Sequence, residues 1–242
     1  MKLTAESVRF RFGGHEVLKG ISFVLDRPEV CGMIGPNGAG KSTLTNVLHG
    51  VLRPTGGAIW FDGHRVDGLP TYAIVRRGFG RTFQIPRLFG RMTVAENLAV
   101  PALATNPRQS RAALDERIDD TLDLARLSRL RNERAHALSG GQKKLLELAR
   151  LVMLDAEIMM LDEPFAGIHP HLQEVMFEFI RRQRELGKAF IVISHEMPTV
   201  FALSDRLLVL SDGQIIADGS PLAVKSDPAV ISAYVGVDDD HA

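Results

Sequence analysis

Gly35-Pro36-Asn37-Gly38-Ala39-Gly40-Lys41-Ser42-Thr43 is the stretch of the chain that decides its fold. It follows a short apolar run, residues 30–34, and precedes residues 44–48, whose apolar positions have helical spacing. A strand, a glycine-rich turn and a helix are the context in which a G-x-x-x-x-G-K-[ST] loop binds phosphate, because the glycines let backbone N–H groups point into one concavity at the helix N-terminus. The pattern predicts that the chain binds a nucleoside triphosphate.

The polar side chains at the end of this loop have distinct expected roles. Lys41 is placed to reach the β- and γ-phosphates, Ser42 to ligate Mg²⁺, and Thr43 to help hold the α-phosphate. The turn and its N–H groups come from the other loop residues, Gly35, Pro36, Asn37, Gly38, Ala39 and Gly40. The alternative is a glycine-rich turn that only connects two elements, and the Lys-Ser-Thr register behind a strand disfavours it.

Size and composition indicate an ordinary globular protein. At 242 residues the chain suits one large α/β domain, or one domain that carries a smaller lobe. Apolar residues make up 45% and charged residues 24%, and the formal net charge of zero gives no whole-molecule attraction to nucleic acid. We therefore expect no nucleic-acid partner.

No segment has the character of a membrane span or a signal peptide. No apolar run approaches the ~20 residues that cross a bilayer, and residues 1–6 lack the apolar core of a signal peptide. The single cysteine, Cys31, lies in the apolar run before the loop, where we expect a buried hydrophobe in a reducing compartment. If the protein serves a membrane, we expect it to do so from the cytoplasmic side, through another chain.

Patterning on both sides of the loop predicts further parts of an α/β fold. Residues 8–12 and 17–25 around Gly13-Gly14 predict a small antiparallel β-layer. Residues 86–137 have helical periodicity and no convincing strand, which predicts a helical lobe inserted in the α/β core. Towards the C-terminus we expect a hairpin at 207–217, a short helical tail at about 220–236 and a disordered acidic stretch at 238–240.

Two predicted strand ends deliver candidate catalytic groups. The apolar run 158–161 ends in Asp162-Glu163, as expected of a buried parallel strand that brings carboxylates to its C-terminal end. His195 follows a second predicted strand, 189–193. Both ends are expected at the edge of the sheet where the phosphate loop lies.

Three smaller features have two interpretations each from the residues alone. Phe12, beside the Gly13-Gly14 turn, is either a core aromatic or a ring that stacks on a purine. Ser139, which precedes two glycines and a predicted helix at 143–154, is either a plain N-cap or part of another anion-binding helix start. A histidine at a strand end, such as His195, is either structural or functional.

The same order of motifs is found in a known family. The phosphate loop, Gln84, Leu138-Ser139-Gly140-Gly141-Gln142, Leu161-Asp162-Glu163-Pro164 and His195 follow one another as they do in ATP-binding cassette proteins, which the chain resembles over nearly its whole length. The Ser-Gly-Gly-Gln signature separates this family from other phosphate-loop ATPases. The resemblance implies one nucleotide-binding domain over residues 1–242: a phosphate-loop NTPase core with a mainly parallel sheet, the N-terminal antiparallel β-layer and the inserted lobe.

The resemblance also implies roles in the hydrolysis of ATP. Asp162 would hold Mg²⁺ opposite Ser42, and Glu163 would orient or deprotonate the attacking water. His195 would contact the γ-phosphate and couple it to Glu163. Gln84 would reach the Mg²⁺ and the water, and would transmit the nucleotide state to the helical lobe.

Other implications concern the base of ATP and a second cassette. Phe12 falls at the family's adenine-stacking position. In this family the signature completes the ATP site of a partner cassette, so hydrolysis implies a homo- or heterodimer whose sites are completed by Ser139, Gly140, Gly141 and Gln142. His169 stands where the family usually has Asp or Asn. It either alters coupling or pH dependence, or simply lies at a helix N-terminus.

Four segments are similar to the ATPase subunits of branched-chain amino acid importers: residues 80–84, 87–89, 92–98 and 227–236. This implies two transmembrane permease subunits as partners, a solute-binding protein as an indirect partner, and a position on the inner face of the cell membrane. ATPases of urea and short-amide importers and of a lipopolysaccharide exporter look similar, so the substrate stays open. A soluble cassette of translation or chromosome maintenance is disfavoured by the single cassette without heptads, and a sensor without turnover by the presence of Gln84, Glu163 and His195.

Overall fold

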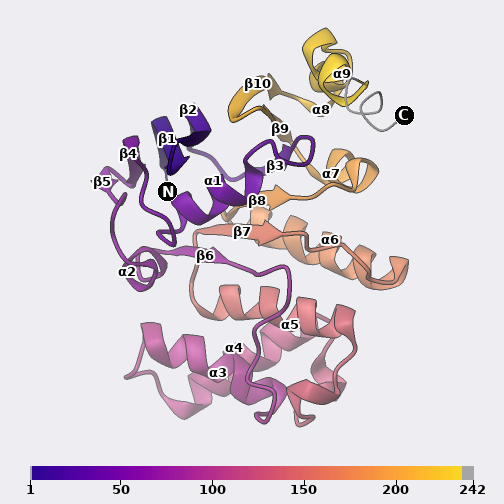
Figure 1. Cartoon of the computed structure of the whole chain (residues 1–242). Helices are drawn as coiled ribbons and strands as arrows, with labels where there is room; N and C mark the ends of the chain where they lie inside the picture. The colour runs from indigo at the N-terminus through magenta and orange to yellow at the C-terminus, as the bar shows by residue number, and fades with distance from the viewer. Residues whose placement is uncertain (1, 236–242) are drawn as a thin grey trace.

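The central sheet carries the phosphate loop on one of its inner strands. The computed structural model describes residues 2–235, and within that range the sheet has the strand order β10-β9-β3-β8-β7-β6 (Figure 1). Its strands are β3 Val30–Ile34, β6 Phe79–Arg81, β7 Ile158–Asp162, β8 Ala189–Ile193, β9 Arg206–Ser211 and β10 Gln214–Gly219. All pairs are parallel except β9–β10. The carboxyl ends of β3, β6, β7 and β8 therefore meet at one edge, where ligands bind in open α/β sheets.

A second, antiparallel sheet covers the phosphate-loop helix, in the order β2-β1-β4-β5. Its strands are β1 Leu3–Phe12, β2 His15–Leu25, β4 Gly56–Phe61 and β5 His64–Arg65. The predicted β-layer is present, but β1 begins at Leu3 and not at Val8. The register with β2 shifts between Ala5 and Val8, where Ser7 has a φ of 47°. This irregularity breaks the alternation of side chains on which the prediction depended.

The inserted lobe is helical, as predicted (Figure 1). Its elements are α3 Val94–Thr105, α4 Arg111–Leu124, and the 3-10 turns η1 Ser128–Leu130 and η2 Ala135–Ala137. Helix α5, Gly140–Met153, follows the predicted lobe in sequence and packs against both α3 and α4 in one hydrophobic cluster. The same cluster includes residues of β7 and β8, so α5 joins the lobe to the sheet.

The remaining helices are α1 Lys41–Leu48, α2 Thr71–Val75, α6 Pro170–Glu185, α7 Met197–Leu203, α8 Pro221–Lys225 and α9 Pro228–Val235. Helix α1 lies between the two sheets, whose facing apolar side chains form a second cluster around it. Helix α7 is absent from the sequence prediction, and it begins two residues after His195. Helices α8 and α9 pack on the β9–β10 side, while residues 238–240, predicted to be disordered, lie outside the described residues.

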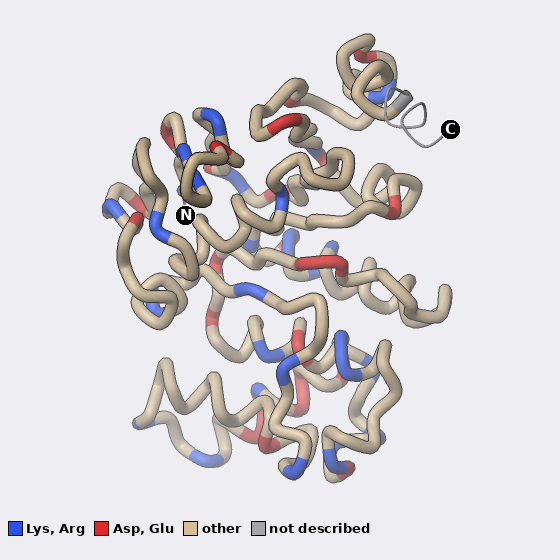
Figure 2. The backbone as a smooth tube through the Cα atoms, viewed as in Figure 1, with Lys and Arg blue, Asp and Glu red and all other residues tan. Residues whose placement is uncertain are grey.

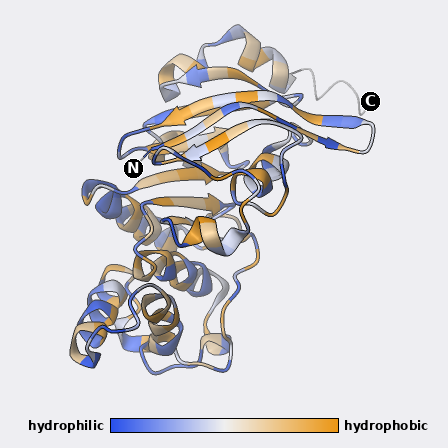
Figure 3. Cartoon of the chain, turned by 90° about the vertical axis from the view of Figure 1, so that its left-hand side faces the viewer, coloured by the Kyte–Doolittle hydropathy of each residue, from blue (hydrophilic) through white to orange (hydrophobic). Residues whose placement is uncertain are grey.

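Polarity follows this layering. Figure 3 shows hydrophobic residues concentrated on the strands and hydrophilic residues on the outer helices of the lobe. Both signs of charge are interspersed along the backbone in Figure 2, in keeping with a formal net charge of zero. Across residues 2–235, none of the helices has the length and apolar character that crossing a membrane requires.

Candidate nucleotide site

A cavity of about 390 Å³ lies at the carboxyl edge of the central sheet. It is lined by His15, Val17, Asn37, Gly38, Ala39, Gly40, Lys41, Ser42, Thr43, Gln84, Asp162, Glu163 and Ile193. These residues come from the β1–β2 hairpin, the phosphate loop, the segment after β6, and the ends of β7 and β8. The predicted phosphate loop, Gln84 and both carboxylates are thus brought together around one space.

The phosphate loop needs glycine at two positions for different reasons. Gly40 is the N-cap of α1 with φ at 99°, a left-handed conformation that a side chain disfavours. A Cβ on Gly35 would lie 2.1 Å from the carbonyl oxygen of Leu210, so the loop can approach the β9–β10 turn only with glycine here. Together they turn the chain directly from β3 into α1 and leave the N-terminal N–H groups of α1 facing the cavity.

The ammonium of Lys41 is hydrogen-bonded to the main chain of the phosphate loop. Its Nζ donates to the carbonyl oxygens of Gly35 at 2.6 Å and Pro36 at 2.9 Å. Burial lowers the pKa of Lys41, and the negative charge of Glu163 opposes that shift. A phosphate in the cavity could replace these neutral acceptors with charged ones, which make stronger hydrogen bonds.

Asp162 is held by an arginine that the sequence prediction did not select. Arg81 Nη2 lies 2.9 Å from Asp162 Oδ2, its Nη1 donates to Asn46 Oδ1 at 2.8 Å, and its side chain is only 7% exposed. The main-chain N–H of Asp162 donates to the hydroxyl of Thr82 at 3.2 Å. The orientation of the carboxylate is therefore set by residues of β6 and α1.

The donor set fits a hard cation that also binds phosphate. The Ser42 hydroxyl, the Asp162 carboxylate and the Gln84 amide line the same cavity. Within residues 2–235, however, no three His, Cys, Asp or Glu side chains are grouped as a metal site. Oxygen ligands with a single carboxylate suit Mg²⁺, which usually takes one or two carboxylates and completes its shell with water and substrate phosphates.

Every polar group of Glu163, in its main chain and in its side chain, is hydrogen-bonded. Its backbone conformation is unusual for glutamate. Its φ is 48°, and its main-chain N–H donates to the carbonyl of Ile193 at 2.8 Å. Oε2 accepts from the hydroxyl of Ser194 at 3.0 Å, and Oε1 accepts from the main-chain N–H of His195 at 3.1 Å. Lys144 Nζ donates to the Glu163 carbonyl at 2.8 Å. Such over-determined local strain is typical of functional positions.

The signature lies apart from this cavity. Ser139 is the N-cap of α5, and it forms a capping box with Gln142: the Ser139 hydroxyl accepts the Gln142 N–H at 3.3 Å, and Gln142 Oε1 accepts the Ser139 N–H at 2.9 Å. Ser139 and Gly140 are exposed, whereas Gly141 is buried against Leu172 and Ile168. The capping interpretation of Ser139 is observed, and it leaves the outer face of the turn open to solvent.

His169 lies at the N-terminus of a helix, as the structural alternative predicts. It is the exposed N-cap of α6, and its Nδ1 accepts the main-chain N–H of His171 at 3.3 Å. Asp and Asn are good N-caps for the same reason, so this histidine preserves the cap of the helix. Nothing in this arrangement requires a special role for the imidazole.

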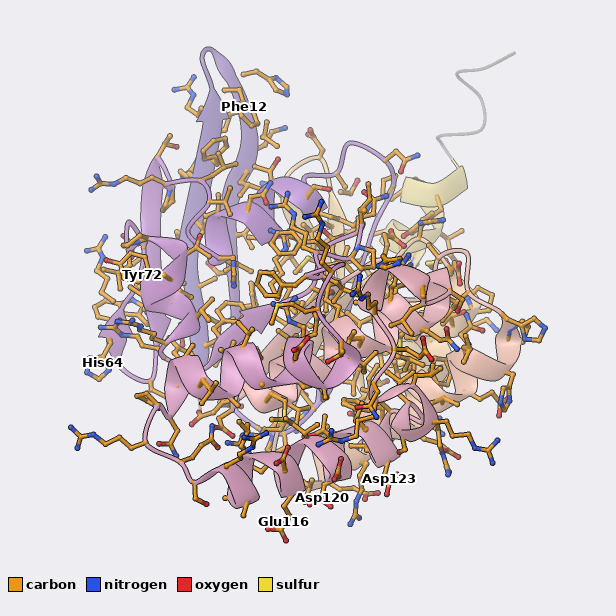
Figure 4. The ribbon with its side chains drawn as sticks, turned by 90° about the horizontal axis from the view of Figure 1, so that it is seen from below. Phe12, His64, Tyr72, Glu116, Asp120 and Asp123 are labelled. Carbon is orange, nitrogen blue, oxygen red and sulfur yellow. The ribbon has the colours of Figure 1, made fainter. Side chains whose placement is uncertain are left out.

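The β1–β2 hairpin lines the cavity with residues other than Phe12, which was predicted to stack on the base of ATP. Phe12 is 55% exposed near the hairpin tip (Figure 4), and its ring packs edge-on against Phe10 with centroids 4.8 Å apart. The cavity lining from this hairpin is His15 and Val17. Phe12 and His15 are direct cross-strand partners, so both side chains point to one side of the hairpin.

The family comparisons agree with the geometry of the site. The ABC transporter family matches residues 18–166, and the family of branched-chain amino acid ATP-binding cassette transporters matches residues 214–240. The first match runs from β2 to the loop after Glu163, and so includes the phosphate loop, the signature and both carboxylates.

Individual relatives are similar over the whole chain. The high-affinity branched-chain amino acid transport ATP-binding protein BraF of Pseudomonas aeruginosa is 38% identical, with 97% of each chain covered. The corresponding LivG of Escherichia coli K12 is 37% identical at the same coverage. The crystal structure of the ADP conformation of MJ1267, an ATP-binding cassette of an ABC transporter, has a TM-score of 0.83 at 32% identity and covers 98% of this chain and 99% of that one. The structural likeness confirms the predicted fold class.

Proposed function

This chain belongs to the ABC transporter family and is one of its ATP-binding ATPases, and we propose that it is the subunit that powers import of branched-chain or related amino acids through separate membrane subunits. The observation that carries the proposal is the convergence of the phosphate loop, Gln84, Asp162 and Glu163 on one cavity. The match of its C-terminal residues to the branched-chain amino acid family supports the choice of substrate class.

The chemistry at this site is positioning and charge stabilisation. Lys41 and the loop N–H groups hold the phosphates, while Ser42, Asp162 and Gln84 supply oxygen ligands for Mg²⁺. The bound Mg²⁺ would neutralise charge on the phosphate oxygens. Glu163, already fixed by Ser194 and the main chain of His195, accepts a hydrogen bond from the attacking water and orients it.

The imidazole of His195 is the proposed sensor of the γ-phosphate. Its Nδ1 lies 2.9 Å from Glu163 Oε1, and its side chain is 66% exposed. A group in this position can contact the terminal phosphate on one side and the catalytic carboxylate on the other. The base of ATP is proposed to lie against the β1–β2 hairpin, on the side that carries Phe12 and His15.

The position of the signature outside the cavity supports a site shared between two cassettes. Ser139, Gly140, Gly141 and Gln142 do not line the cavity of their own chain, so we propose that they face the γ-phosphate bound by a second cassette. ATPase activity per subunit should then fall on dilution. A rate per subunit that stays constant on dilution would contradict a shared site.

The partners proposed are a second cassette, two transmembrane permease subunits and, indirectly, a solute-binding protein, with this chain on the cytoplasmic face of the membrane. The test is co-purification from membranes with a tag on this chain. Two multispanning proteins, a second cassette and an amino-acid-binding protein would support the proposal. Partners of a urea or lipid system would change the substrate, and ribosomes without membrane proteins would overturn transport altogether.

A further inference from the structure

Two side chains of helix α5, Glu147 and Arg150, form hydrogen bonds with the main chain of the segment that contains Gln84. The carboxylate of Glu147, in a residue only 5% exposed, accepts the main-chain N–H of Phe83 at 3.3 Å and that of Arg87 at 3.0 Å. Arg150, three residues further along α5, donates from Nη1 to the carbonyl of Arg87 at 2.6 Å. Residues 83–87 are therefore bonded to α5 at both ends.

The segment leaves the central sheet immediately before its first hydrogen bond to α5. The main-chain N–H of Thr82 donates to the carbonyl of Met160 at 2.9 Å, and the Thr82 hydroxyl accepts from Asp162, so the chain up to Thr82 belongs to the sheet. Gln84 follows two residues later and is exposed to the cavity. Its position relative to Asp162 thus depends on how α5 holds its neighbours.

The same helix also holds the loop that follows Glu163. Lys144 Nζ donates to the carbonyl of Glu163 at 2.8 Å and to that of Ala166 at 2.7 Å. Lys144 and Glu147 are three residues apart on α5, so they lie on one face of the helix. One continuous helix therefore fixes the spacing between the Gln84 segment and the Glu163 loop.

We propose that Glu147 is a positioning residue for ATP hydrolysis: it fastens the Gln84 segment to α5, to which Lys144 fastens the Glu163 loop, so that Gln84 and Glu163 are kept in register. The inference rests on the proposed function because it concerns the rate of hydrolysis. Glu147 acts through the main-chain amides of Phe83 and Arg87, and not by contact with the nucleotide.

The environment of Glu147 favours this role over simple filling of the core. Burial raises the pKa of Glu147, and the N–H groups of Arg87 and Phe83, with the charges of Arg150 and Lys144, oppose the rise. A buried carboxylate is costly unless it is hydrogen-bonded, whereas an apolar side chain would fill the same space without that cost. The two amides that the carboxylate accepts bracket Gln84 in the sequence.

The experiment follows the mobility of the Gln84 segment with a nitroxide spin label on the full chain carrying Ile85→Cys. Ile85 is 80% exposed and adjoins Gln84. The native Cys31 is 1% exposed, and burial raises the pKa of its thiol to about 12, so labelling is directed to position 85. Mobility is compared with kcat and the KM for ATP, measured on the unlabelled proteins at one fixed concentration.

Three substitutions separate positioning from stability. Glu147→Gln keeps the shape but turns one acceptor oxygen into an N–H₂ group that faces a main-chain N–H. Lys144→Met keeps the length of the side chain and removes its charge. Glu29→Gln is the matched control. Glu29 is a buried carboxylate that binds Arg27 and Arg206, and it lies just before the amino end of β3, at the other end of that strand from the phosphate loop.

We expect Glu147→Gln to lower kcat about tenfold, to change the KM for ATP less than twofold and to make the label more mobile before ATP is added. Lys144→Met should lower kcat without loosening the label, and Glu29→Gln should change neither. A label as immobile in Glu147→Gln as in the wild type overturns the proposal, as does a loss of kcat that Glu29→Gln reproduces at an equal loss of Tm. A wild-type chain without ATPase activity in the presence of the second cassette that co-purifies with it contradicts the proposed function, and label mobility still decides the role of Glu147.

Discussion

Nδ1 of His195 lies 2.9 Å from Oε1 of Glu163, and the same carboxylate oxygen accepts the main-chain N–H of His195 at 3.1 Å. The two side chains differ in exposure, at 66% for His195 and 13% for Glu163. The carboxylate is thus fixed within the protein, while the imidazole faces solvent. Substitution of Glu163 and substitution of His195 should therefore have different effects.

Glu163→Gln should abolish turnover and keep ATP binding. The amide retains the size of the side chain but is a poor base and a poorer acceptor for water, so we expect kcat to fall by about 10²–10⁴-fold. Steady-state hydrolysis and equilibrium binding of ATP measure the two effects separately. Glu174→Gln, at an exposed position on α6, is the matched control and should leave both unchanged. Loss of binding in Glu163→Gln would contradict the assigned role.

His195→Ala should lower kcat with little effect on folding. Because the side chain is largely exposed, its removal should change the free energy of unfolding by about 0.5 kcal/mol or less. A contact made mainly to the developing charge of the γ-phosphate is worth about 10²-fold in kcat. Denaturant unfolding and ATPase rates on the same sample test both statements. An unchanged kcat would make His195 a structural residue.

Arg81→Met should destabilise the nucleotide-free protein and enlarge its stabilisation by MgATP. Removal of Arg81 leaves the partly buried carboxylate of Asp162 without its cation, at a cost of about 3 kcal/mol. Mg²⁺ bound with ATP would supply positive charge again. Tm values with and without MgATP measure this difference. Arg117→Met, which removes a more exposed ion pair with Asp155, is the control and should shift both Tm values equally.

The ends of the parallel strands were predictable from sequence because local patterns mark them. Continuous apolar runs predict β3, β7 and β8, and the residues that follow are the phosphate loop, Asp162-Glu163 and His195. Parallel strands bring these ends to one edge, so the core of the site follows from local signals and one topological rule. The family resemblance placed Gln84 at the same edge.

The supporting contacts were not predictable, for physical reasons. Arg81 pairs with Asp162 across 81 positions of sequence, and nothing local in either segment marks that pair. Lys144 and Glu147 bind main-chain carbonyl and amide groups, which every residue offers, so no partner residue type could reveal them. On an amphipathic helix such as α5 their charges are typical of a solvated face.

His49 predicts a pH dependence of stability. His49 is 3% exposed at the C-terminal end of α1, and its ring packs edge-on to Phe79. Burial, with the nearby charge of Arg81, lowers its pKa from 6.5 to about 4, although the main chain of Phe79 opposes the shift. Between these values the unfolded chain binds a proton that the folded chain does not. Stability should therefore fall as the pH drops from 6.5 to 4, by about 3 kcal/mol from this group.

His49→Leu isolates that contribution from the acid sensitivity of the carboxylates. A leucine removes the titrating group and leaves no buried nitrogen unpaired, so the difference in the free energy of unfolding between variant and wild type should shift by about 3 kcal/mol in favour of the variant between pH 7 and pH 4. Urea unfolding across this range measures it. His64→Leu, at an exposed histidine on β5 (Figure 4), is the control for the replacement of a histidine by leucine, and its pH profile is measured in parallel. Parallel pH profiles for wild type and His49→Leu would show that His49 takes up its proton equally in the folded and unfolded states.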